Sequence, residues 1–360
     1  MDKILANRLI NEINYMAEKE IKIMEVCGTH TQVISKIGIK SVMTPQIKLL
    51  SGPGCPVCVT DEEYIDTAIE ILRNYDVAIA SFGDLLRVRG TNSSLLDEKS
   101  KGKDVRVIYS PLDLIKMAYG EDKEIVFLGV GFETTAPVIA LAIKTSFERK
   151  LYNLSFLTSI KFMSPILRHI LEQPEKQIDG LICPGHVASV KGSEYFRFIT
   201  DEYNIAAAIC GFEGMDILSV IHYLVKQINM NENLSLANLY KRCVKPMGNQ
   251  VANQLMKEVF QVSDGNWRAI GNIKDSFLSI NNKYRKFDAA EKYKVNIDIK
   301  KIATKCACRE ILLGVKTPIE CHFFDRSCSP LNPLGPSMVS SEGSCAIAYK
   351  YRKVEEWKEI

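Results

Sequence analysis

The sequence predicts an α/β protein with two Rossmann-like parallel-sheet lobes, followed by a helical, cysteine-rich C-terminal part. Between residues 76 and 228, β-prone runs alternate with helical stretches, which is typical of βαβ units. A Gly-Phe-Glu triplet occurs twice, at 131–133 and 211–213, as two related lobes would have. The 360 residues are also more than one domain usually needs.

Each β-prone run leads into a turn rich in Gly or Pro, and several are followed by a helix-like stretch such as 138–149 or 216–228. Because ligands of parallel sheets gather at the carboxyl ends of the strands, polar motifs at these turns are the first candidates for a site. The β-prone runs are 76–83, 125–131, 154–160, 179–183 and 205–210.

We expect three parts in chain order: a first lobe over 1–120, a second over 121–233, and a helical, cluster-binding part over 234–360. The stretch from 234 to 284 is polar and favours helices. From Cys306 onward the chain is rich in Cys, Pro and Ser and has little periodicity. Apolar residues alone would build little core there, so a metal would supply the missing order.

Composition excludes several classes of function. With 46 basic and 43 acidic residues and no basic block, the chain does not resemble a nucleic-acid-binding protein. The apolar run 124–131 is too short to cross a membrane, and the N-terminus lacks the apolar segment of a signal peptide. These features predict a cytoplasmic protein. Its 11 cysteines, in a reducing compartment, indicate metal or redox chemistry rather than structural disulfides.

The tail offers five thiols, those of Cys306, Cys308, Cys321, Cys328 and Cys345. A 4Fe-4S cluster needs four thiolates from different loops, without regular spacing. Zinc sites usually show Cys-x2–4-Cys pairs, and the only close pair here is Cys-x-Cys. The pattern therefore favours a 4Fe-4S cluster. Zinc and unliganded thiols are the alternatives, and one of the five thiols would be spare.

Cys55 and Cys58 form a Cys-x-x-Cys motif just before a predicted helix. Thr60 fits the N-cap and Glu63 the third helical position of a capping box. The positive end of the helix dipole lowers a thiol pKa and raises its reactivity, which favours a redox dithiol. Half of a zinc site is the alternative.

Cys27 and His30 lie three residues apart where a predicted strand, 21–26, ends in a turn. A thiolate and an imidazole at this spacing can reach one bound metal, and His30 can also serve as a base towards Cys27. A buried cysteine with a capping histidine is the alternative interpretation.

Two further strand ends carry polar side chains. Glu133 is a candidate general acid or base, and Thr134 or the residue after it can cap a helix whose free N–H groups bind anions. Cys183 and His186 repeat the spacing of a thiol and an imidazole. The alternatives are a plain capping loop and a strand-core cysteine.

Five segments together resemble the hydrogenase maturation proteins of the HypD family, in the family's order and over nearly the whole chain. The resemblance implies two Rossmann-like lobes, a 4Fe-4S cluster, and a scaffold role in assembling the Fe(CN)2CO group of NiFe hydrogenases. Implied partners are the small chaperone HypC, the cyanide donor HypE and, indirectly, the hydrogenase large subunit. The segments are MEVCGTHT (24–31), GPGCPVC (52–58), GFETTAP (131–137), CPGHV (183–187) and MVSSEG (338–343).

The resemblance also implies residue roles. Cys27 would hold the iron together with a cysteine of HypC, and His30 would orient or assist it. Cys55 and Cys58 would pass electrons between cluster and iron. The cleft would be lined by Glu133, Thr134 and His186, and the cluster would be bound by Cys308, Cys321, Cys328 and Cys345, with Cys306 as the alternate.

One position departs from the family pattern: many relatives carry Cys where this chain has Ser337. A serine is a poor cluster ligand, which favours Cys345 as the fourth ligand and leaves Cys306 without a partner if the two positions pair in relatives. Two other functions stay open at this point. They are a cluster-linked thiol–disulfide oxidoreductase, in which Cys27 would not matter, and a zinc-stabilised binding module.

Overall fold

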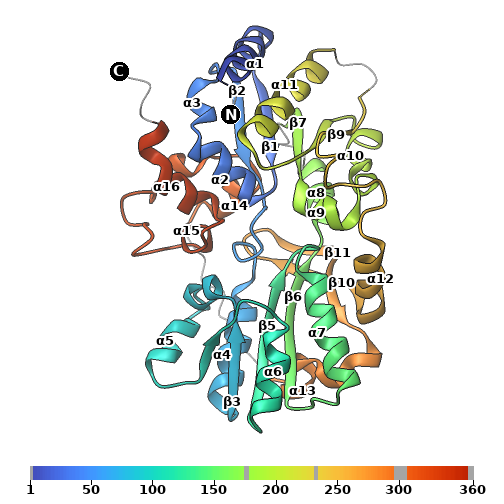
Figure 1. Cartoon of the computed structure of the whole chain (residues 1–360). Coiled ribbons are helices and arrows are strands. Elements are labelled where there is room, and N and C mark those ends of the chain that lie inside the picture. Colours follow the sequence, from blue (N-terminus) through green and yellow to red (C-terminus); the bar gives the residue numbers. More distant parts are fainter. Residues whose placement is uncertain (1–2, 174–177, 231–233, 296–305, 356–360) are drawn as a thin grey trace. The chain divides into compact units, whose positions relative to one another are not determined.

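The computed structural model describes residues 3–173, 178–230, 234–295 and 306–355, which form two compact units with one sheet each (Figure 1). Unit 1 comprises Met1–Cys55, Ile166–Asn249 and Cys306–Ile360, and unit 2 comprises Pro56–Pro165 and Gln250–Lys305. The α/β class with two sheets is confirmed. The units do not follow the boundaries expected at 120 and 233, because each sheet draws its strands from separate parts of the chain.

The sheet of unit 1 has five parallel strands in the spatial order β2-β1-β7-β8-β9. Ile23 in the second strand of this order pairs with Leu49 on one side and with Gly180 on the other. The strands are β1 (Ile21–Glu25), β2 (Ile47–Ser51), β7 (Gly180–Pro184), β8 (Ala206–Cys210) and β9 (Ala237–Asn238). The α-helices of this unit are α1 (Lys3–Met16), α2 (Gly28–Lys36), α3 (Ile39–Val42), α9 (Gly185–Lys191), α10 (Phe198–Asp201), α11 (Gly214–Met230), α14 (Cys308–Leu312), α15 (Pro336–Val339) and α16 (Ser344–Glu355).

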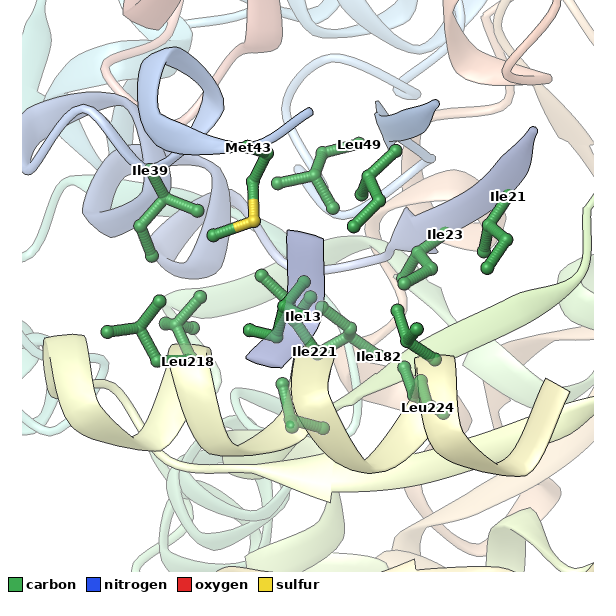
Figure 2. Close-up of a cluster of buried hydrophobic side chains, with 14 of the residues drawn as sticks. Ile13, Ile21, Ile23, Ile39, Met43, Leu49, Ile182, Leu218, Ile221 and Leu224 are labelled. Carbon is green, nitrogen blue, oxygen red and sulfur yellow. The ribbon is translucent and has the colours of Figure 1, made fainter. Parts of the chain in front are cut away.

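Helices α1 and α11 cover the unit 1 sheet with a continuous apolar core (Figure 2). Leu218, Ile221 and Leu224 recur at helical spacing on α11 and face Ile13 of α1 and Ile23 of β1. All five are fully or almost fully buried. Each such side chain contributes about 1.5–3 kcal/mol relative to exposure. This core fixes the strand ends that carry the polar motifs.

The sheet of unit 2 has six strands in the order β10-β11-β6-β5-β3-β4. The four strands β3, β4, β5 and β6 are parallel, and β10 and β11 form an antiparallel hairpin on the edge of β6. The strands are β3 (Val77–Ser81), β4 (Val105–Val107), β5 (Glu124–Gly131), β6 (Leu154–Lys161), β10 (Phe260–Trp267) and β11 (Gly271–Ile280). The α-helices are α4 (Glu62–Asn74), α5 (Leu95–Ser100), α6 (Asp113–Gly120), α7 (Ala136–Glu148), α12 (Gln250–Val259) and α13 (Ala289–Tyr293), and α8 (Met163–Leu171) begins here and continues into unit 1.

The hairpin corrects the expectation that 234–284 is mainly helical. Only α12 is helical in the middle of this stretch, and β10 and β11 follow it. β10 buries little more than Phe260 and Trp267 at its ends, and the residues between them are polar or exposed. Because most of its side chains are polar or exposed, β10 lacks the apolar run by which the other strands were predicted.

Four short 3-10 helices complete the secondary structure of the described residues. They are η1 (Gly83–Arg87), η2 (Glu194–Phe196), η3 (Asn282–Phe287) and η4 (Pro318–Glu320). None of the helices within the described ranges has the length and apolar character that a membrane crossing requires.

Candidate thiol site

The carboxyl edge of the unit 1 sheet gathers the polar motifs from four strands. β1 ends just before Cys27, and β2 ends four residues before Cys55. β7 and β8 lead into His186 and Phe212. Since the strands are parallel, these segments share one edge although they lie up to 185 residues apart, from 27 to 212.

Cys27 is the N-cap residue of α2 and is held by a buried carboxylate. The backbone N–H of Cys27 donates to Glu25 Oε2 at 3.0 Å, and the Thr31 hydroxyl donates to Glu25 Oε1 at 2.5 Å. Glu25 is 3% exposed, and burial raises its pKa. The carboxylate therefore ties the end of β1 to the first turn of α2.

Two opposing influences act on the Cys27 thiol. Burial raises its pKa to about 12, and the charges of Glu25 and Glu342 act in the same direction. The backbone N–H groups of His30 and Thr29, at the start of α2, favour the thiolate. Burial thus keeps the sulfur as a neutral thiol, in a position where backbone N–H groups already face it.

His30 is fully buried beside Cys27 and is stacked on an aromatic ring. Its Nε2 lies 3.0 Å from the carbonyl oxygen of Gly211, and burial lowers its pKa to about 4. Phe212 lies between two imidazoles, with ring centroids 4.7 Å from His30 and 3.9 Å from His186. The imidazole of His186 is exposed on its other face, and partial burial lowers its pKa.

The loop before the Cys-x-x-Cys motif lies directly against Cys27. The N–H of Gly28 donates to the carbonyl of Gly54 at 3.3 Å. A Cβ atom at Gly54 would come within 2.4 Å of the backbone nitrogen of Cys27, so only glycine allows this approach. Cys55 follows immediately, which brings the start of the motif next to Cys27.

Cys55 and Cys58 form a disulfide, whereas the other nine cysteines are not disulfide-bonded. Cys55 is 5% exposed and Cys58 1%. The capping box expected for Thr60 and Glu63 was wrong: Asp61 is the N-cap, and its carboxylate accepts from the N–H of Glu63. The Thr60 hydroxyl instead donates to the Pro56 carbonyl at 2.8 Å, since Thr60 lies in the turn of the motif and not on the helix.

The five tail thiols converge in unit 1. Cys328 and Cys345 lie in a small core with Ile311 and Met338, and Cys321 packs against it. Burial raises the pKa of Cys345, and the charges of the other four tail cysteines add to the rise. Burial also raises the pKa of Cys306 to about 12, with contributions from three of the same thiols. Such mutual effects require sulfur atoms that are close in space.

Ser337 lies beside Cys308. Its hydroxyl is 3.4 Å from the Cys308 sulfur, and both side chains are buried. Among the described residues, no three His, Cys, Asp or Glu side chains are grouped closely enough to hold one metal ion.

The tail also reaches the Cys27 loop. A Cβ at Gly28 would come within 2.6 Å of the carbonyl oxygen of Glu342, which belongs to the segment before α16. Helix α16, which carries Cys345 in its first turn, packs against α2. The structure therefore brings the tail and Cys27 together within one unit.

Glu133 and Thr134 belong to unit 2, at the carboxyl end of β5. Glu133 is fully buried and accepts from the N–H of Met163 at 2.8 Å. Thr134 is exposed, and Thr135 is the N-cap of α7 without a side-chain hydrogen bond. Cys183 is a buried residue of β7 whose pKa is raised by burial, as its strand-core interpretation predicts.

Sequence reasoning missed three residues of the site. Glu25 and Phe212 stand inside motifs that were recognised, but only the fold shows that they hold Cys27 and the two imidazoles. Cys210, at the end of β8, is close enough to Cys27 that the charge of Cys27 raises its pKa. No pattern in the sequence distinguishes this cysteine from an ordinary strand residue.

The fold and the site together define a cysteine-dependent α/β protein. It has two mainly parallel sheets, a disulfide-forming Cys-x-x-Cys motif and a thiol-rich tail packed beside a buried thiol. The model of the HypD family, described as "Hydrogenase formation hypA family", matches residues 4–352. The chain therefore belongs to the HypD family of hydrogenase maturation factors.

Several relatives are similar over most of their length. The hydrogenase maturation factor HypD of Escherichia coli K12 is 37% identical over 347 residues, which are 96% of this chain and 93% of the relative. The HypD of Rhodobacter capsulatus is 38% identical over 351 residues, with 96% and 93% covered. That of Azotobacter vinelandii is 36% identical over 355 residues, again with 96% and 93% covered.

Proposed function

We propose that this protein is the iron–sulfur scaffold on which Fe(CN)2CO is assembled for a NiFe hydrogenase, in complex with a HypC-type chaperone. One observation carries the proposal: Cys27, the loop of Cys55 and the cysteine-rich tail adjoin one another in unit 1. A thiol that holds iron, a dithiol that passes electrons and a cluster that stores them must be neighbours to act on one substrate.

Cys27 is the proposed thiolate for the iron substrate, with a cysteine of the HypC-type partner as the second. Burial holds the free thiol neutral, while the N–H groups of Thr29 and His30 face the sulfur. A bound cation would supply the charge that favours deprotonation, so metal binding and proton loss are coupled. The Gly211 carbonyl orients His30 beside it.

Cys55 and Cys58 are the proposed redox pair. They interconvert between the disulfide seen here and a dithiol, by exchange of two electrons and two protons. The contact between Gly54 and Cys27 supports this role, because Cys55 directly follows Gly54. His186 lies at the same sheet edge as Cys27. We also propose a role in this chemistry for Glu133 and Thr134, which follow β5.

The tail thiols fit a 4Fe-4S cluster. Cys308, Cys321, Cys328 and Cys345 are the proposed ligands, with Cys306 as the alternate, and their mutual electrostatic repulsion is relieved when iron binds the thiolates. Each thiolate of a cluster binds a different iron, so the four sulfur atoms lie further apart than around a single ion. When bound, the cluster would supply a store of single electrons.

The remaining parts of the proposal concern partners and location. We propose that cyanide arrives from a HypE-type donor, that the hydrogenase large subunit receives the finished group indirectly, and that the protein works in the cytoplasm. Its near-neutral charge, with 46 basic and 43 acidic residues, supports neither nucleic acid nor an anionic membrane surface as a partner.

Replacement of Cys27 tests the scaffold role. The Cys27→Ala variant should abolish maturation of the hydrogenase in cells that lack their own HypD. Cys243→Ala, at an exposed cysteine of the same unit, is the matched control and should mature it normally. Full maturation by Cys27→Ala would reject the scaffold role.

The disulfide favours one alternative, a thiol–disulfide oxidoreductase linked to a cluster. In that case Cys55→Ser and Cys58→Ser would abolish activity while Cys27→Ala would not. Anaerobic iron and sulfide analysis of single Cys→Ser variants of the tail tests the cluster. Colourless protein with zinc and without iron would favour a zinc-stabilised binding module instead.

A further inference from the structure

Lys161, the last residue of β6, is a fully buried lysine that the proposed function does not use. Its Nζ donates to the Ser159 hydroxyl at 2.6 Å and lies 4.7 Å from the centre of the Phe277 ring. A third contact, of 3.4 Å, joins Nζ to the hydroxyl of Thr60. All these residues belong to unit 2.

Within the described parts of the chain, the Lys161 ammonium forms no ion pair with a carboxylate. The acidic group that influences it is Asp61, through its charge. Burial lowers the pKa of Lys161 to about 7. A buried cation without a counter-charge is costly, and a negative charge that formed nearby would offset this cost.

The contact with Thr60 connects this cation to the Cys-x-x-Cys turn. The Thr60 hydroxyl donates to the Pro56 carbonyl at 2.8 Å, and the Thr60 N–H donates to the Val57 carbonyl at 3.3 Å. Thr60 is therefore folded back over the turn that contains Cys58, which is only 1% exposed. In this dry interior a charge acts with little screening.

We propose that Lys161 is a positioning residue that sets the redox equilibrium of the Cys55–Cys58 pair, by stabilising the thiolate of Cys58 when the disulfide opens. This inference rests on the proposed redox role of the pair. The Cys58 thiolate is then the negative charge that the buried ammonium lacks while the disulfide is intact.

The step balances with a dithiol as reductant. One thiolate of the reductant attacks the sulfur of Cys55, the less buried of the pair, and the bond between Cys55 and Cys58 breaks. The electron pair leaves on the sulfur of Cys58, where Lys161 stabilises the charge. The second thiol of the reductant then displaces Cys55, so that the reductant becomes a disulfide. Its one remaining proton passes to the sulfur of Cys55, and Cys58 stays a thiolate beside Lys161.

Redox equilibration of the purified full-length protein tests this role. Wild type, Lys161→Met and Lys161→Gln are equilibrated with reduced and oxidised dithiothreitol, alkylated and digested with trypsin. The peptide from Leu49 to Arg73 contains Cys55 and Cys58 and no other cysteine, so mass spectrometry reads this couple alone. Lys144→Met is the matched control, because Lys144 pairs with Glu258 in the same unit.

Both neutral variants should shift the equilibrium about tenfold towards the disulfide, which corresponds to a potential about 30 mV more negative, and Lys144→Met should not. Methionine fills the space without a charge and glutamine keeps a hydrogen-bond donor, so a shift shared by both reports charge and not packing. The inference would be overturned if Lys161→Met and Lys161→Gln had the same redox equilibrium as wild type. An equal shift in Lys144→Met would also overturn it. Maturation assays of Cys55→Ser and Cys58→Ser test the proposed function separately, since they do not depend on Lys161.

Discussion

The carboxylate of Glu25 accepts hydrogen bonds from both the backbone N–H of Cys27 and the hydroxyl of Thr31. One oxygen serves each donor, and the group is buried. Glutamine at this position offers a single oxygen to two donors, so Glu25→Gln leaves one donor without its bond. We expect a fall in the free energy of unfolding of about 1–3 kcal/mol, measured by urea denaturation.

Glu20→Gln is the control for this change, because Glu20 is exposed and forms a surface ion pair with Lys22. Equal stability of Glu25→Gln and wild type would show that the carboxylate does not hold the Cys27 turn.

Gly54 fixes the approach of the Cys-x-x-Cys loop to Cys27. In Gly54→Ala the new Cβ would lie 2.4 Å from the nitrogen of Cys27, and a backbone atom cannot rotate away. The two loops must separate, so we expect loss of hydrogenase maturation and a stability loss of about 1–3 kcal/mol. Gly120→Ala, where a Cβ meets nothing within 4 Å, should behave as wild type. Normal maturation by Gly54→Ala would contradict the importance of this contact.

Burial of His30 makes stability depend on pH. Its pKa is lowered to about 4 in the folded protein, whereas the unfolded chain takes up the proton near pH 6.5. The unfolded state therefore binds more protons between these values, and the free energy of unfolding falls as the pH drops from 6.5 to 4. His30→Gln removes this contribution. The stability difference between wild type and variant, followed by denaturation across this range, should shrink towards low pH; a constant difference would contradict the shift.

The position of Ser337 predicts the effect of restoring a thiol. Its hydroxyl lies 3.4 Å from the sulfur of Cys308, so Ser337→Cys places a second thiol beside a proposed cluster ligand. Under air, the two should form a disulfide and withdraw Cys308 from the cluster. Iron and sulfide content should then fall, whereas Ser341→Cys, at an exposed position of the same segment, should retain it. Full cluster content in oxidised Ser337→Cys would argue against Cys308 as a ligand.

The buried charge of Lys161 should also affect the free energy of unfolding, in a way that depends on pH. Its pKa is lowered to about 7 in the folded state, and the unfolded side chain titrates near 10.5. The cost of burying the ammonium is therefore complete below pH 7 and disappears as the pH rises to 10.5. Lys161→Met should gain roughly 1–3 kcal/mol at pH 6, and the gain should vanish near pH 10.5. A gain that does not vary with pH would point to packing alone.

The alternation of β-prone and helical stretches was sufficient to predict two sheets that are mainly parallel. Cys55 was expected only just before a helix. Cys27 and His186 were expected where predicted strands end, and parallel strands bring such ends to one edge. This part of the site follows from local patterns, because strand direction and strand ends are encoded within a few residues.

The pairing of distant strands is not encoded locally. Ile23 pairs with Gly180, and nothing in either segment specifies the other, so consecutive lobes were the natural expectation. The polar β10 strand lacks the apolar alternation that identifies a half-buried strand. The sequence also did not predict that Lys161 is buried, because a lysine at the end of a strand is ordinarily exposed. It is buried by packing against Phe277 and the Thr60 turn, which are distant in sequence.

The three-segment construction of unit 1 has a consequence for biosynthesis. Glu342 lies against Gly28 and helix α16 packs on α2, yet the ribosome makes both long after Cys27. A nascent chain thus carries Cys27 with this side uncovered until α16 has been made. The buried environment of Cys27 is therefore complete only after the tail has folded onto α2.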